Sequence, residues 1–131
     1  MRALAFLALV CATVRTPKHP TVSGCLVWIA MQAVDYLGSP TLAAIPIGAY
    51  EPRHLMKDAH MHPEEAVKAF EDLQAQYGVA IHWGTFKLTT ERMDEPPERL
   101  LQSLKNQRIP YDKFRALSHG EKWDAPFAKK M

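Results

Sequence analysis

Two short apolar stretches decide the fold: AAIPIG at residues 43–48 and VAIHW at residues 79–83. Each is too short for a helix of ordinary length and is closed by a glycine, which is typical of a buried strand that ends in a turn. Pro46 lacks a backbone donor, so the first stretch is expected at an edge or an end of the sheet.

Helical patterns lie between and after these strands. The sequence His-Pro-Glu-Glu at 62–65 predicts a helix start, because proline suits the first turn and carboxylates complement the positive end of the helix dipole. Gly78 is expected to end this helix. A second amphipathic helix is predicted over 98–107, after a loop over 87–97, and a last strand over 111–117. This alternation predicts an α/β fold with a parallel sheet, whose functional residues lie in the loops after the strands.

Composition excludes some functions. The chain has 131 residues, which is enough for one domain, and a formal net charge of +2 without a run of basic residues. Nothing therefore indicates a nucleic-acid-binding protein. The two cysteines, Cys11 and Cys25, lack the spacing of a zinc finger, and a disulfide between them would require an oxidising compartment.

Residues 1–42 differ from the rest because they are apolar and nearly uncharged. The run at 3–14, after Arg2, fits a secretory signal peptide and is too short to span a membrane as a helix. A buried helix or strand is the simpler alternative, and sequence foreign to the fold is a third. We therefore predict three segments: an N-terminal segment of unclear origin at 1–42, the folded region at 43–123 and a tail at 124–131.

The histidines are the candidate reactive groups. His54, His60 and His62 lie close together in sequence beside carboxylates, a weak signal for a metal site that ordinary loop residues would also produce. His82 ends a predicted strand and is expected to project into a cleft, although a buried histidine bonded to a backbone carbonyl is equally compatible. Arg53 is a surface residue or a contact for an anionic group.

A series of motifs resembles one enzyme family. They are IPIGAYEPR at 45–53, His60, PEEAV at 63–67, IHWGTF at 81–86 and EPP at 95–97. In this order they are similar to the N-acyl-phosphatidylethanolamine-hydrolysing phospholipases D, which belong to the metallo-β-lactamase superfamily.

The resemblance implies an αββα sandwich, of which residues 43–123 form an incomplete, C-terminal part. It implies that His82 is a zinc ligand and that His60 assists catalysis or substrate binding. The implied reaction is zinc-dependent hydrolysis of a membrane phospholipid, N-acyl-phosphatidylethanolamine, to phosphatidic acid and an N-acylethanolamine. The family location would be membrane-associated or intracellular, whereas the apolar N-terminus leaves secretion open.

The superfamily motif HxHxDH is absent from this sequence, and Asp35 lacks the context of the family's bridging aspartate. Because a zinc ion needs about three protein ligands, we expect the isolated chain to be inactive. Ile45, Ile47, Val79 and Ile81 are expected to form a sheet face that is uncovered unless residues 1–42 cover it, and an uncovered face would favour a homodimer. Two alternatives remain: a non-enzymatic remnant or interaction protein, and a secreted zinc-binding module that uses His54, His60 and His62.

Overall fold

The computed structural model describes residues 7–8 and 38–124. Its order of elements is β1 (Leu7–Ala8), β2 (Leu42–Pro46), α2 (Arg53–Met56), α3 (Pro63–Asp72), β3 (Tyr77–Ile81), α4 (Glu95–Asn106), η1 (Tyr111–Lys113) and β4 (Phe114–Arg115). The four strands form one parallel sheet in the order β1-β2-β3-β4. The α/β class predicted from the sequence is therefore confirmed.

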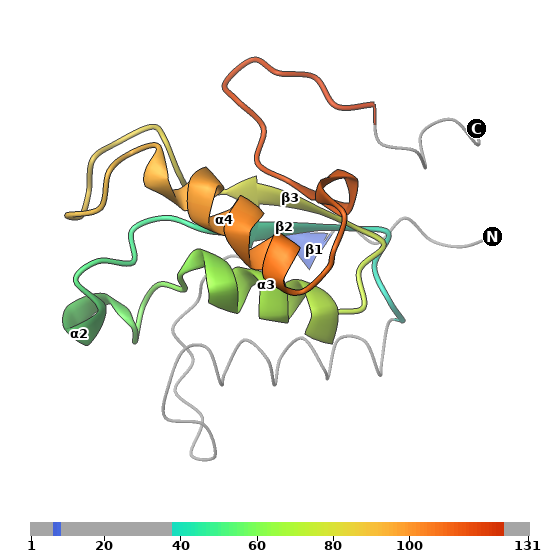
Figure 1. The fold of residues 1–131 in the computed structure, drawn as a ribbon, viewed down its shortest axis with the longest axis horizontal. Helices are drawn as coiled ribbons and strands as arrows, with labels where there is room; N and C mark the ends of the chain where they lie inside the picture. The colour runs from blue at the N-terminus through green and yellow to red at the C-terminus, as the bar shows by residue number, and fades with distance from the viewer. Residues whose placement is uncertain (1–6, 9–37, 125–131) are drawn as a thin grey trace.

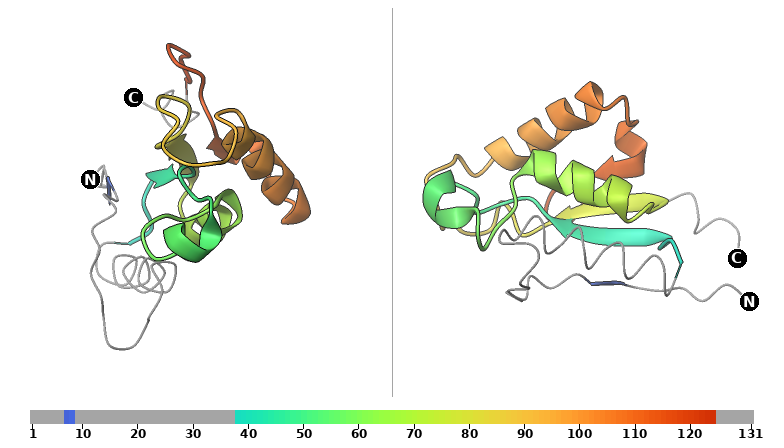
Figure 2. Two further views of the ribbon diagram at one scale, coloured as in Figure 1. Left: turned by 90° about the vertical axis from the view of Figure 1, so that its left-hand side faces the viewer. Right: turned by 90° about the horizontal axis from the view of Figure 1, so that it is seen from below.

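The helices α3 and α4 cover the same face of this sheet (Figures 1 and 2). The core between them contains Ile45 and Ile47 from β2 and the segment after it, together with Leu100 and Leu104 from α4. Phe70 of α3 and Phe114 of β4 stack with ring centroids 5.2 Å apart. The core therefore holds together segments that are distant in the sequence.

The predicted start of the first helix is confirmed in detail. His62 is the N-cap of α3: its Nδ1 accepts from the Glu65 backbone N–H at 3.3 Å, and the Glu65 carboxylate accepts from the His62 N–H at 3.1 Å. Pro63 occupies the first turn, where its missing donor costs nothing. The second helix begins at Glu95, earlier than predicted, with Pro96 and Pro97 in its first turn.

The predicted role of Gly78 is wrong. The helix α3 ends at Asp72, the chain turns at Gln74 with a φ of 50°, and Gly78 lies inside β3. A Cβ on Gly78 would lie 2.8 Å from the Phe114 ring and 3.1 Å from the Phe70 ring. Glycine is required there because two aromatic rings pack against the strand, a contact that local sequence does not reveal.

The prediction that Ile45, Ile47, Val79 and Ile81 share one face of the sheet is also wrong. In the register of β2 and β3, Ile45 pairs with Ala80 and Ala44 pairs with Val79. Ile45 and Ile47 therefore point into the helix-covered core, where both are fully buried, whereas Val79 is on the opposite face. The prediction of a homodimer through this sheet remains a prediction.

Leu7 and Ala8 pair with Ala43 and Ala44, so these two residues extend the sheet. Apart from residues 7–8, the run predicted as a signal peptide lies outside the described residues, as do the two cysteines and Asp35. Within the described part, no helix is long and apolar enough to cross a membrane.

Candidate functional site

The candidate site lies where β2 and β3 end, at the same edge of the sheet. The Ile47 N–H donates to the Ile81 carbonyl at 3.1 Å, which continues the pairing just past the end of β2. The segments that follow β2 and β3 then each turn at a residue with left-handed backbone, Ala49 with a φ of 63° and His82 with a φ of 60°. Non-glycine residues rarely adopt this conformation, and such positions are concentrated at functional sites.

The close approach of these two turns depends on Gly48. A Cβ at Gly48 would collide with the carbonyl oxygen of His82 and lie 3.2 Å from the Trp83 Cα. The motif IPIG therefore has a physical basis, because only glycine allows the His82 backbone to lie against the end of β2.

His60 and His82 come together at this edge. His60 lies between α2 and α3, and its backbone N–H donates to the Met56 carbonyl at 2.8 Å. Its ring centroid is 5.2 Å from that of His82, with an angle of 40° between the planes. The two histidines named from the sequence are thus neighbours, while their chemical roles remain predictions.

The surroundings favour a neutral imidazole at His60. Burial lowers the pKa of His60, and the neighbouring His82 lowers it further, against an opposing effect of Glu91. A neutral imidazole has one nitrogen lone pair free for a proton or a metal ion. His60 is therefore suited to accept a proton or to bind a metal at neutral pH.

The described residues do not make a complete zinc centre. A zinc ion needs about three protein ligands, and across 7–8 and 38–124 no three His, Cys, Asp or Glu side chains are grouped to hold one. His62 is used as the cap of α3 and contacts Glu64 at 2.7 Å, while His54 is exposed on α2. Among the described residues, His54, His60 and His62 are therefore not grouped as a zinc site.

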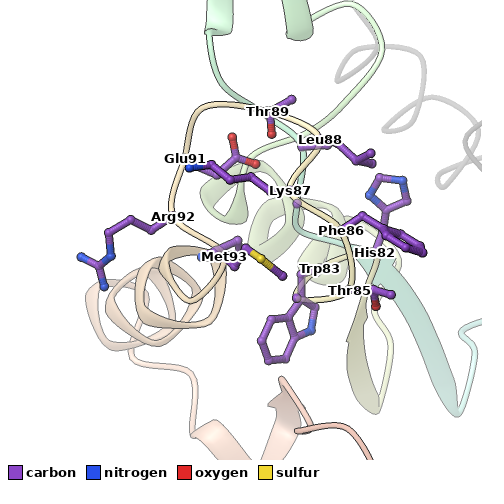
Figure 3. A pocket seen from close by; sticks show the side chains of 14 residues that line it. His82, Trp83, Thr85, Phe86, Lys87, Leu88, Thr89, Glu91, Arg92 and Met93 are labelled. Atoms are coloured by element: carbon purple, nitrogen blue, oxygen red, sulfur yellow. The ribbon is translucent and has the colours of Figure 1, made fainter.

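A cavity of about 260 Å³ opens beside His82. Figure 3 shows the imidazole of His82 on the same side of the pocket loop, residues 84–94, as Phe86 and Leu88. The side chains that line the cavity are mainly apolar, with a few charged groups: Trp83, Phe86, Leu88, Met93 and Pro96, with Lys87, Glu91 and Arg92. This lining suits a ligand with an apolar part and a charged part.

Glu91 attaches the pocket loop to the turn after β2. Its carboxylate accepts from the Tyr50 N–H at 3.3 Å and from the Glu51 N–H at 3.2 Å. Burial raises the pKa of Glu91, but hydrogen bonds from Thr89 and from backbone N–H groups outweigh it, so the pKa is lowered overall. The ionised carboxylate is the form that accepts these bonds.

Tyr50 and Arg99 join the same turn to α4. The buried Tyr50 donates its hydroxyl to Glu95 at 2.7 Å, and the Arg99 guanidinium lies 5.2 Å from the ring centroid. Burial raises the pKa of Tyr50, and the hydrogen bond to Glu95 raises it further. Tyr50 therefore stays protonated and acts as a structural donor.

His119 was not singled out as a candidate from the sequence, although it reaches this end of the molecule. Its Nε2 lies 3.1 Å from the Thr85 hydroxyl, and its ring centroid lies 6.3 Å from that of Trp83. In the sequence His119 is followed by Gly120, a local turn pattern that says nothing about a contact with residues more than thirty positions earlier.

Comparison with known proteins identifies relatives of this chain. A family model described as a β-lactamase superfamily domain matches residues 21–83. The chain is 43% identical over 93 residues to an N-acyl-phosphatidylethanolamine-hydrolyzing phospholipase D 1 of Caenorhabditis elegans, covering 70% of this chain and 26% of that protein. It is 42% identical over 59 residues to the mitochondrial N-acyl-phosphatidylethanolamine-hydrolyzing phospholipase D of Saccharomyces cerevisiae, covering 45% and 13%. An uncharacterized protein of Mycobacterium tuberculosis is 41% identical over 71 residues, covering 52% and 18%.

The chain thus spans about a quarter or less of the length of these curated relatives. The family match begins at residue 21, upstream of Ala43, and the segment boundary at Ala43 stays a prediction. The match includes the IPIG strand, the helix α3 and the strand that leads to His82. The chain is therefore similar to the N-acyl-phosphatidylethanolamine-hydrolysing phospholipases D, and residues 21–83 match part of a β-lactamase superfamily domain.

Proposed function

We propose that this chain represents part of a metal-dependent phosphodiesterase of the phospholipase D type. The proposed substrate is N-acyl-phosphatidylethanolamine, and the products are an N-acylethanolamine and phosphatidic acid. The observation that carries the proposal is the pairing of His60 with His82 beside an apolar cavity. The substrate and the reaction in this proposal are taken from the relatives, two of which are named for this hydrolysis.

In this proposal His82 is a zinc ligand and His60 contacts the substrate or takes part in proton transfer. The lowered pKa of His60 supports proton transfer, because only a neutral imidazole has a free lone pair that can accept a proton. The described residues supply too few ligands for a zinc ion, so the isolated chain is expected to bind little zinc and to be inactive.

A lipid substrate agrees with the exposed apolar side chains at this end of the molecule. Leu55 on α2 is 67% exposed, and Phe86 and Leu88 on the pocket loop are 75% and 67% exposed. The helix α2 and the pocket loop lie at the same end (Figures 1 and 2). The exposed Lys57 and Lys87 add positive charge that suits a phosphate headgroup.

A test of the function transfers this site into a complete relative. The region of the C. elegans enzyme that aligns with this chain is replaced by the corresponding residues of this chain, and N-acylethanolamine release from vesicles of N-acyl-phosphatidylethanolamine is measured by mass spectrometry. We expect an active chimera that loses activity and zinc with His82→Ala. His54→Ala is the matched control, because His54 is exposed and has no place in the site.

The same assays on the 131-residue chain separate two further outcomes. Near-zero zinc without hydrolysis agrees with the expected inactivity of the isolated chain. A folded chimera that carries zinc but does not hydrolyse the lipid would contradict the proposed substrate.

The non-enzymatic alternative has one observation in its favour. Exposed apolar side chains beside the cavity, without a three-ligand group in the described residues, suit an interaction surface. It would be favoured if a well-folded chimera had no activity while the isolated chain was a stable, monodisperse protein.

A further inference from the structure

Arg53 makes a set of contacts that the chemistry proposed above does not use. It lies at the start of α2, and its side chain is 27% exposed. Its Nη1 donates to the His60 backbone carbonyl at 2.9 Å. Its Nη2 donates to both oxygens of the Glu65 carboxylate, at 3.1 and 3.2 Å. One guanidinium therefore connects α2, the backbone of His60 and the first turn of α3.

Both backbone polar groups of His60 are held by α2. The N–H donates to the Met56 carbonyl at the end of the helix, and the carbonyl accepts from Arg53 at its start. Fixing the backbone limits where a side chain can point, because rotamers depend on the backbone angles. These two bonds therefore restrict the orientations open to the His60 ring, which lies with its centroid 5.2 Å from that of His82.

Glu65 secures the other side of the same segment. Its carboxylate accepts from the His62 N–H at 3.1 Å while it binds Arg53, and its own N–H donates to His62 Nδ1. The helix cap and the Arg53 ion pair thus share one carboxylate. Residues 60–62 are held between Arg53 on one side and Glu65 on the other.

We infer that Arg53 is a positioning residue that holds His60 against His82 through the His60 carbonyl and the Glu65 carboxylate. This inference rests on the proposed function, because the value of the arrangement lies in the reactivity assigned to the two histidines. Arginine suits the task because its planar group makes several bonds in fixed directions at once. Lysine has a single ammonium and cannot reproduce this geometry.

A purely structural ion pair would have a different consequence. It would stabilise the start of α3 without controlling where the His60 ring lies. Arg99 provides the matched comparison, since it binds Glu64 at 2.8 and 3.1 Å in the same first turn of α3 and has no hydrogen bond to His60.

The experiment uses the full chain and nuclear magnetic resonance, without substrate or metal. The measured signals are the nuclear Overhauser effect between the ring protons of His60 and His82 and the exchange rate of the His62 amide. In Arg53→Lys we expect the ring-to-ring signal to be lost and the amide to exchange about tenfold faster or more, as expected for a weakened charge-assisted hydrogen bond. In Arg99→Lys the ring-to-ring signal should persist even if the melting temperature falls.

Glu65→Gln is the second variant, in case Arg53→Lys does not fold. Glutamine can still cap the helix but lacks the charge that binds Arg53, so the ring-to-ring signal should again be lost. An unchanged signal in either folded variant, with only a lower melting temperature, would overturn the inference. Because neither measurement uses hydrolysis, loss of the signal beside an inactive chimera would leave the positioning role intact and reject the function alone.

Discussion

Gly48 shows how a single residue controls the geometry of the site. It has no Cβ, and the space that one would occupy is filled by the His82 carbonyl oxygen. His82 is itself in left-handed backbone, a conformation that persists only where the surroundings impose it. The absence of a side chain at one position therefore fixes the location of an imidazole 34 positions later in the chain.

Gly48→Ala should displace the end of β3. The added methyl group has no room, so we expect a loss of about 1–3 kcal/mol in the free energy of unfolding, typical of an overpacked interior. Chemical denaturation gives the stability, and the resonances of the His60 and His82 rings report the displacement. Gly38→Ala is the comparison, because a Cβ there meets no atom within 4 Å and tests only the left-handed backbone. Unchanged ring resonances in Gly48→Ala would contradict this account.

At the scale of elements, hydrogen bonds between loops and helices position the site, in addition to the pairing of the strands. Glu91 binds the turn after β2, Arg53 joins α2 to α3, and Tyr50 joins the turn to α4 through Glu95. Each tie is a hydrogen bond to a charged group in a partly buried place, which is stronger than a neutral one. The orientation of the pocket loop therefore depends on a small number of carboxylates.

Glu91→Gln should weaken the attachment of the pocket loop. One charged acceptor that serves two backbone N–H groups is replaced by a neutral one, with an expected loss of about 1–2 kcal/mol at neutral pH. The pKa of Glu91 in the folded chain is lowered from an ordinary value near 4.5, so its contribution is complete above that pH and disappears as the pH falls through the folded pKa.

The check is the pH dependence of the unfolding free energy of both proteins. The difference between the original chain and Glu91→Gln should be constant near pH 7 and shrink below about pH 4.5, where the unfolded carboxylate takes up a proton first. Asp94, whose pKa is also lowered, is present in both proteins and cancels in the difference. A difference that grows in acid would contradict the assigned sign.

At the scale of the whole molecule, the exposed apolar side chains are unevenly distributed. Leu55, Ile81, Phe86, Leu88 and Met93 lie on α2, at the end of β3 or in the pocket loop, whereas Leu101 lies on α4. A patch of exposed apolar groups beside reactive residues is typical of a surface that meets a ligand, a membrane or another protein. The candidate reactive histidines and the candidate lipid-binding surface therefore share one end of the molecule.

Replacing both Phe86 and Leu88 with serine should reduce binding to vesicles. Removing two exposed apolar side chains from a lipid contact should weaken the partition coefficient by about tenfold or more. Co-sedimentation of the chain with vesicles of N-acyl-phosphatidylethanolamine and phosphatidylcholine measures it. Leu101→Ser is the control. Equal binding of the two variants, or loss of a dimer on gel filtration in place of lost lipid binding, would contradict a lipid-facing surface.

The sequence by itself indicated the alternation of strands and helices, the start of α3 and the resemblance to one enzyme family. These depend on neighbouring residues and on motifs that can be read locally: a strand followed by Gly48, a proline and two carboxylates in the first turn of a helix, a histidine at the end of an apolar run. His60 and His82 were named as candidates on the same basis. No local pattern predicted that the two imidazole rings are neighbours.

Only the tertiary structure decided which residues meet. The register of β2 against β3 placed Ile45 in the core and Val79 on the opposite face, and two aromatic rings required glycine inside β3 at Gly78. The approach of His60 to His82 and the contacts of Arg53 arise from packing between segments that are separated in sequence. Such contacts depend on how the elements are stacked, and stacking is determined by the whole chain at once and not by any short stretch of it.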